Sequence, residues 1–267
     1  MNLLHLLEKA LLDIIDGSYA IRPQPLPDRD RLANCKIVSH RGEHDNRTVF
    51  ENTLTAFDSA KADGVWGIEC DLRWTKDLEP VIIHDADLRR VFGLDTKVCD
   101  VTLAELKAVC DRVPSLEEVI RRYAKQLHIM LEIKDEAYPD PTRQNRVLTD
   151  LFSALSPRED FHIMTLSPRM FRVIDFVPPS TFIPIARLNS RKLSELARHE
   201  NYCGLAGHYL FLTNPMLKKH SDIQQKMGTG YIGSKNCLFR ELNRGIEWIF
   251  SNNAADLQKI VQRLLKH

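Results

Sequence analysis

Seven side chains suited to acid–base, metal-binding or phosphate chemistry lie in the first half of the sequence. Each stands at the end of a short apolar run or inside one: they are His40, Arg41, Glu69, Asp71, His84, Glu132 and Lys134. Such runs are typical of buried strands, and parallel α/β barrels keep their active sites at the carboxyl ends of their strands. We therefore expect the seven groups to meet at one mouth.

The three carboxylates form a candidate cation site. Glu69 and Asp71 are two residues apart, so on a strand they point to the same side, and Glu132 lies in another apolar run. Buried carboxylates are costly unless something neutralises them, and oxygen-only ligands suit Mg²⁺ or Ca²⁺ better than Zn²⁺. The alternative is that Glu69 and Asp71 form salt bridges with Arg73 or Lys76.

Two histidines and two cations complete the set. If His40 and His84 flank a bound ester, one can accept a proton from an attacking hydroxyl while the other gives a proton to the leaving oxygen. Arg41 offers a planar fork and Lys134 a point charge for phosphate oxygens. The alternatives are structural histidines and solvated surface cations.

One connection indicates how His84 reaches the others. Only about four residues, 76–79, form the connection between the strand expected at about 65–73 and the apolar run at 81–83. A parallel crossover needs a dozen or more residues, so the second run should return antiparallel. This hairpin arm would bring His84 to the top of the strand that carries Glu69 and Asp71.

The rest of the chain alternates between strand and helix patterns, which favours a (β/α)8 TIM barrel over an open sheet. The expected strands are 35–39, 65–73, 128–133, 162–165, 182–186, 203–207, 231–233 and 247–250. The expected helices are 53–62, 103–109, 116–123, 142–155, 168–176, 192–200, 215–227, 238–244 and 254–265. We predict a single domain over 1–267, with an N-terminal helix and linker at 1–34 and the hairpin and a small insertion at about 74–112.

Composition narrows the class of protein. The net charge of +1 argues against nucleic-acid binding, and 43% hydrophobic residues supply one sizeable core. The six cysteines are widely and irregularly spaced, which indicates reduced thiols and a cytoplasmic protein. No run approaches the ~18 apolar residues of a membrane span, so no stable membrane insertion is expected. The Leu-rich segment 1–15 is expected to be a helix that covers the open end of the core, the alternative being an interfacial anchor.

The motifs, taken in order, resemble those of the glycerophosphodiester phosphodiesterase family. The series is His40-Arg41-Gly42, Glu51-Asn52-Thr53, Ile68-Glu69-x-Asp71, His84-Asp85 and Glu132-Ile133-Lys134. The resemblance implies a TIM barrel with a small insertion after the second strand. It implies an acid–base pair, His40 and His84, and a divalent cation, Mg²⁺ or Ca²⁺, on Glu69, Asp71 and Glu132. It also implies phosphate binding by Arg41 and Lys134, with Glu51 as a supporting residue on the substrate side.

The implied reaction is metal-dependent hydrolysis of a small-molecule glycerophosphodiester to glycerol 3-phosphate and an alcohol. The glycerol hydroxyl next to the ester would attack phosphorus, and the resulting cyclic phosphate would then be hydrolysed. Three alternatives stay open: a lysophospholipase D-type enzyme on lipid substrates, a barrel that only binds phosphate-containing ligands, and a metal-dependent sugar isomerase. The sequence does not indicate the oligomeric state.

Four departures from the family pattern concern the substrate pocket rather than the reaction. Phe50 stands where proline is common, and Leu78 replaces the usual glycine of the hairpin turn. Gly233-Ser234-Lys235-Asn236 stands in place of Trp-Thr-Val-Asn, and Ser251-Asn252 in place of Thr-Asp.

Overall fold

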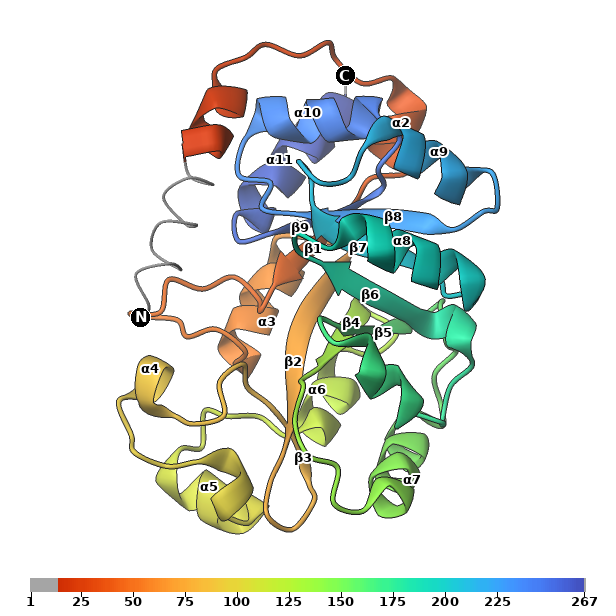
Figure 1. The fold of residues 1–267 in the computed structure, drawn as a ribbon. Coiled ribbons are helices and arrows are strands. Elements are labelled where there is room, and N and C mark those ends of the chain that lie inside the picture. The colour runs from red at the N-terminus through yellow and green to blue at the C-terminus, as the bar shows by residue number, and fades with distance from the viewer. Residues whose placement is uncertain (1–13, 267) are drawn as a thin grey trace.

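Eight parallel strands close into a barrel in the computed structural model, which describes residues 14–266 (Figure 1). They are β1 (Lys36–His40), β2 (Gly67–Trp74), β4 (His128–Ile133), β5 (Phe161–Thr165), β6 (Phe182–Ala186), β7 (Gly204–His208), β8 (Lys226–Gly230) and β9 (Trp248–Ser251). Neighbours in this order are hydrogen-bonded, and β9 pairs with β1 to close the ring. The TIM-barrel prediction is confirmed.

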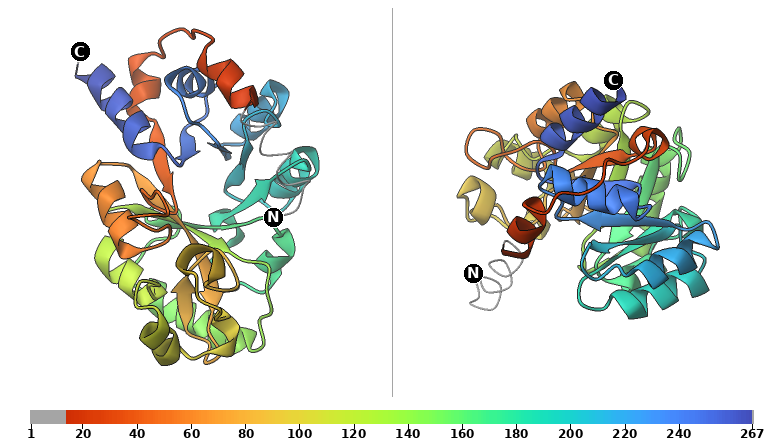
Figure 2. Two further views of the ribbon diagram at one scale, coloured as in Figure 1. Left: turned by 90° about the vertical axis from the view of Figure 1, so that its left-hand side faces the viewer. Right: turned by 90° about the horizontal axis from the view of Figure 1, so that it is seen from above.

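Helices cover the outside of the barrel (Figure 2). They are α2 (Arg29–Ala33), α3 (Leu54–Ala62), α6 (Leu116–Tyr123), α7 (Pro141–Phe152), α8 (Ser190–His199), α9 (Asn214–Ser221), α10 (Lys235–Asn243) and α11 (Ala254–Leu265), with 3-10 turns η2 (Pro168–Arg172) and η3 (Pro179–Thr181). Local sequence sets several starts: the Thr53 side chain caps α3, and Ser115 forms a capping box with Glu118 on α6.

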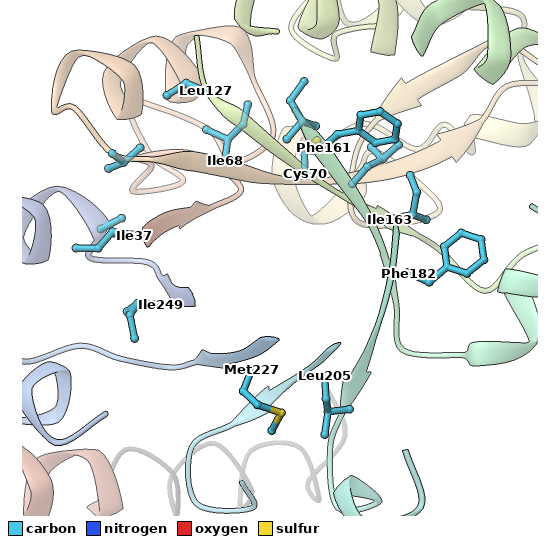
Figure 3. Close-up of a cluster of buried hydrophobic side chains, with 14 of the residues drawn as sticks. Ile37, Ile68, Cys70, Leu127, Phe161, Ile163, Phe182, Leu205, Met227 and Ile249 are labelled. Carbon is cyan, nitrogen blue, oxygen red and sulfur yellow. The ribbon is translucent and has the colours of Figure 1, made fainter. Parts of the chain in front are cut away.

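Alternation along the strands divides the apolar core into two layers. Residues pointing into the barrel form one cluster: Val38, Met130, Met164, Ile183, Ala206, Trp248 and Phe250. Their neighbours, among them Ile37, Ile163 and Leu205, point outward and pack beneath the helices (Figure 3). By the same alternation His40 and Glu132, two residues beyond Val38 and Met130, belong to the inward face.

The hairpin arm forms as expected. Strand β3 (Pro80–Ile82) pairs antiparallel with β2, with Leu72 opposite Ile82. The insertion that follows contains α4 (Arg89–Phe92), the 3-10 turn η1 (Val98–Asp100) and α5 (Leu103–Val109). It has its own apolar cluster with the arm: Val81, Ile83, Leu88, Val98, Leu106, Cys110 and Val113. Figure 1 shows α4 and α5 beside the arm, at the opposite end of the molecule from α10.

The seventh barrel strand, β8, differs from the prediction. It is Lys226–Gly230 rather than 231–233, and the preceding helix ends at Ser221 rather than at residue 227. The strand contains two glycines and therefore lacks an apolar run. A Cβ on Gly228 would lie 2.8 Å from the Phe250 ring, so this position needs glycine for close packing inside the barrel. The helix expected at 168–176 is only the short turn η2.

Most of the predicted N-terminal helix lies outside the described residues. Residues 14–20 are helical, and Tyr19 packs edge-on against Tyr209, just after β7. All six cysteines are free. Among residues 14–266, no helix is both long and apolar enough to cross a membrane.

Candidate active site

Three carboxylates from β2 and β4 meet near the carboxyl ends of these strands. Asp71 is the register partner of Glu132, and Glu69 lies two residues before Asp71 on the same face. One oxygen from each of the three lies within 4.8 Å of the others, and all three residues are buried. The predicted acidic cluster is therefore assembled.

Two cations lie against this cluster, the buried Lys134 and the partly buried Arg41. Lys134 Nζ is 2.5 Å from Asp71 Oδ1 and 2.6 Å from Glu132 Oε1. Arg41 Nε is 3.1 Å from Asp71 Oδ2. These cations balance only part of the acidic charge, because the cluster holds three carboxylates and Arg41 is shared with a further acid.

Among residues 14–266, neither Arg73 nor Lys76 forms a salt bridge with Glu69 or Asp71, so that alternative is wrong. The Nη1 of Arg73 lies 2.6 Å from Glu136 Oε2 instead, and its Nε donates to the carbonyl of His84 over 2.8 Å. Arg73 thus fixes the backbone at the end of the arm.

The acidic cluster fits a divalent cation. Burial, with the charges of Asp71 and Glu132, raises the pKa of Glu69 well above its ordinary value. Burial and Asp71 raise the pKa of Glu132, whereas Lys134 and Arg41 outweigh burial at Asp71 and lower its pKa. Glu69 Oε1 is buried and has no hydrogen-bond partner among the described residues. An unpaired carboxylate oxygen in such a place is what a hard cation would satisfy.

His40, the last residue of β1, has a defined tautomer. Its Nδ1 lies 2.7 Å from Asn252 Oδ1, an acceptor, so Nδ1 carries the proton and Nε2 keeps its lone pair. Nε2 lies 3.8 Å from Glu69 Oε2. Burial and the neighbouring Arg41 lower the pKa of His40 to about 4. Neutral His40 therefore presents a proton acceptor to the site.

His84, just beyond β3, is held by a carboxylate instead. Its Nδ1 lies 2.7 Å from Asp85 Oδ1, and a third of its side chain is exposed. Burial lowers the pKa of His84, while Asp71 and the bond to Asp85 oppose that shift. A carboxylate partner favours the protonated ring, so His84 is the better proton donor of the two.

Arg41 is aimed by an unusual turn after β1. Arg41 and Gly42 both have positive φ, at 60° and 78°, and the Arg41 amide donates to the Glu69 carbonyl over 2.9 Å. The Nη1 of Arg41 donates to Glu51 Oε1 over 3.0 Å. Burial would raise the pKa of Glu51, but bonds from Arg90 and the charge of Arg41 outweigh it and lower the pKa to about 2. Glu51 is thus a fully charged support for Arg41.

Three supporting residues were not predicted as site residues. Asn52, at φ 57°, donates to Asp71 Oδ2 over 2.7 Å. Asn252 orients His40, and Arg90 of α4 bonds Glu51. Asn52 and Asn252 lie in segments that correspond to family motifs, so the resemblance could have marked them as site residues. Arg90 lies in the insertion, where charged residues are common and nothing in the spacing marked it.

The substitution at Phe50 has a packing role. The Phe50 and Phe92 rings lie 5.5 Å apart, and the Arg112 guanidinium lies 4.6 Å and 4.7 Å from their centres. Such stacking is worth ~0.5–1 kcal/mol per exposed cation–π contact. Phe50 therefore fastens the loop after β1 to the insertion.

The fold and the site together define an α/β barrel whose reactive groups gather at the carboxyl ends of its strands, the usual position of a TIM-barrel active site. The model of the glycerophosphoryl diester phosphodiesterase family matches residues 40–203, more than half of the chain. The chain belongs to this family. The matched segment contains all eight residues predicted for the site.

Individual relatives agree with this assignment. A glycerophosphodiester phosphodiesterase of Bacillus altitudinis is 34% identical over 125 residues, 42% of this chain and 50% of the relative. One from Caldanaerobacter subterraneus is 36% identical over 110 residues, 37% of this chain and 44% of the relative. The alignments thus span half or less of these relatives.

Solved structures share the fold. The crystal structure of a glycerophosphodiester phosphodiesterase from Thermotoga maritima superposes with a TM-score of 0.69 at 23% identity, covering 85% of this chain and 98% of that one. A phosphodiesterase from Oleispira antarctica, solved in complex with its product sn-glycerol-3-phosphate, gives 0.67 at 19% identity, covering 85% and 96%.

Proposed function

We propose that this protein hydrolyses glycerophosphodiesters to glycerol 3-phosphate and an alcohol, with the help of a divalent cation. The observation that carries the proposal is the meeting of a buried three-carboxylate cluster with two histidines held differently at Nδ1. Family membership supports the substrate class, as does the glycerol 3-phosphate complex of the Oleispira antarctica phosphodiesterase.

Glu69, Asp71 and Glu132 would hold the cation, Mg²⁺ or Ca²⁺. When bound, it supplies positive charge that stabilises the negative phosphoryl oxygens. The chain itself supplies further charge: Lys134 as a point charge and Arg41 as a fork for phosphate oxygens. Arg41 Nη2 has no protein partner within residues 14–266 and is available for an oxygen of the ester.

The two histidines divide the proton transfers. His40 Nε2 accepts the proton of the substrate hydroxyl that attacks phosphorus, because its lone pair faces the site. His84 Nε2 donates a proton to the leaving alcohol, because Asp85 supports its charged form. Cleavage leaves a cyclic phosphate, and in its hydrolysis the histidines exchange roles, His84 accepting a proton from water and His40 returning one to the glycerol oxygen. Each transfer contributes about 10²–10⁴-fold to the rate.

The test is release of glycerol 3-phosphate from a panel of glycerophosphodiesters, in EDTA and after addition of Mg²⁺ or Ca²⁺. We expect release only with the cation, and a loss of about 10²–10⁴-fold in kcat for His40→Ala or His84→Ala. Lysophospholipids in the same panel test the lipid alternative.

Metal binding provides an independent readout. Calorimetric titration with Mn²⁺ should show one site in the wild type, and the isosteric Glu69→Gln and Glu132→Gln variants should weaken it. A folded protein that binds the ion but cleaves no member of the panel would leave only a binding role. Full activity in EDTA would contradict the metal assignment.

We further propose a cytoplasmic location for the enzyme. All six thiols are free, and such thiols persist in a reducing compartment. Thiol labelling of the protein in fractionated cells would test this, and recovery in an oxidising compartment would contradict it.

A further inference from the structure

The insertion contributes a charged residue to a network that reaches both sides of the candidate active site. Arg90 lies on α4, which packs beside the loop that follows β1 (Figure 1). Its Nη2 lies 2.6 Å from Glu51 Oε1 and its Nη1 lies 3.0 Å from Glu51 Oε2. Its Nε lies 2.5 Å from Asp85 Oδ2. One guanidinium therefore bonds two carboxylates through three nitrogens.

Each carboxylate bonded by Arg90 holds a residue of the proposed reaction. Asp85 holds His84 through its other oxygen, over 2.7 Å. Glu51 Oε1 accepts from Arg41 as well as from Arg90. The chain of contacts thus runs from His84 through Asp85, Arg90 and Glu51 to Arg41.

We propose that Arg90 is a positioning residue that sets both the proton donor and the phosphate-binding arginine, an inference that rests on the proposed function. It fixes the Asp85 carboxylate and so the ring orientation and Nδ1 proton of His84. It also shares the charge of Glu51, so that Arg41 is not fully neutralised by that carboxylate and keeps its attraction for a phosphate oxygen. Arg90 itself does not have to touch substrate.

The geometry of the guanidinium explains why an arginine is present. Only a planar group with several donors can bond both oxygens of Glu51 and reach Asp85 at once. Nearly half of the Arg90 side chain is exposed, and without it the buried Glu51 still bonds Arg41 and Asn46. Loss of Arg90 should therefore affect turnover far more than folding.

The test compares two esters of glycerol 3-phosphate in wild type and Arg90→Ala. One ester has an alkyl alcohol, such as choline, and needs a proton at the leaving oxygen; the other has p-nitrophenol, which leaves without one. We expect Arg90→Ala to lower kcat on the alkyl ester about 10- to 100-fold, a fraction of one proton transfer. The loss on the aryl ester should be clearly smaller, and KM should change less than kcat.

Rescue and a neighbour provide the controls. Guanidinium ion added to Arg90→Ala should restore part of the lost rate on the alkyl ester, and Arg90→Lys should be intermediate. Arg89→Ala is the matched control, because Arg89 lies on the same helix and, among residues 14–266, its side chain pairs with the exposed Asp95 alone; it should leave kcat unchanged. If Arg90→Ala does not fold, Asp85→Asn should show the same ester dependence.

Equal losses on the two esters would overturn the role of Arg90 in setting the proton donor, and a loss that guanidinium does not restore would overturn the positioning role as a whole. An inactive wild type would instead count against the proposed function, so the two failures are distinguishable.

Discussion

At the scale of single residues, the two histidines are distinguished by what accepts their Nδ1 protons. His40 faces a neutral amide and His84 a carboxylate. A carboxylate stabilises the imidazolium, and an amide oxygen does so much less. The same ring can thus serve as a base in one place and as an acid in the other.

Asn252 should therefore matter for turnover although it does not take part in proton transfer. Asn252→Leu removes the acceptor that fixes the His40 tautomer, so we expect kcat to fall about 10- to 100-fold, less than the loss from removing the base itself. Steady-state hydrolysis of glycerophosphocholine measures this. Asn253→Ala is the neighbouring control, since Asn253 is exposed and, within the described part of the chain, its side chain forms a single long hydrogen bond, to the Gly233 carbonyl at 3.4 Å. A wild-type rate for Asn252→Leu would contradict the tautomer argument.

The site residues that the sequence could predict are those marked by their immediate neighbours in the sequence. Glu69, Asp71 and Glu132 lie inside apolar runs, where a charge is costly and therefore conspicuous. Asn252 and Arg90 act through partners 212 and 39 residues away. Asn252 lies in a segment that departs from the family motif and Arg90 in ordinary surface sequence, and the closed barrel and the folded insertion bring them to the site.

At the scale of elements, the turn after β1 sets the direction of Arg41. Two consecutive positive φ values reverse the chain there. Gly42 is needed twice over: its φ is 78°, and a Cβ would lie 2.7 Å from the Ala56 backbone of α3. The site and the first helix are therefore packed against each other at this glycine.

Gly42→Ala should be strongly destabilising. The left-handed backbone costs an alanine ~1–2 kcal/mol, and the overlap with α3 adds ~1–3 kcal/mol. Urea unfolding should show a total loss of about 2–5 kcal/mol. Gly93→Ala isolates the backbone contribution, because Gly93 has φ 70° and nothing within 4 Å of an added Cβ. Equal losses in the two variants would show that the contact with Ala56 is relieved at no cost.

Elements with an apolar period were predicted nearly to the residue, as in β4, β6 and α11. The seventh barrel strand, β8, was not, because Gly228 serves close packing against Phe250 inside the barrel and the strand has no run of apolar side chains. Patterns of hydrophobicity detect runs of apolar side chains, and this strand has a single apolar side chain, Met227.

At the scale of the whole molecule, the barrel has a second polar layer at the opposite end from the site. His128 and His162 begin the inward faces of β4 and β5, with His128 Nε2 2.7 Å from His162 Nδ1. His128 Nδ1 donates to the Glu159 carbonyl over 3.0 Å, so each ring donates through Nδ1, and the Cys203 thiol can donate to His162 Nε2, 3.1 Å away. The chain is fully bonded only while both rings are neutral.

This layer should make the fold sensitive to acid. Burial lowers the pKa of His128 to about 4, and burial with His128 lowers that of His162 further, whereas an unfolded histidine titrates near ~6.5. Below that pH these histidines are protonated in the unfolded chain but stay neutral in the folded barrel. The free energy of unfolding therefore decreases as pH falls from about 6.5 toward 4. Each ring can cost ~2 kcal/mol between pH 6.5 and 5.

Urea unfolding across this range should show a smaller decline for His162→Gln than for the wild type, by about 2 kcal/mol. His199→Ala, which removes an exposed ring, should leave the slope unchanged. An unchanged slope in His162→Gln would mean that other buried histidines carry the acid sensitivity.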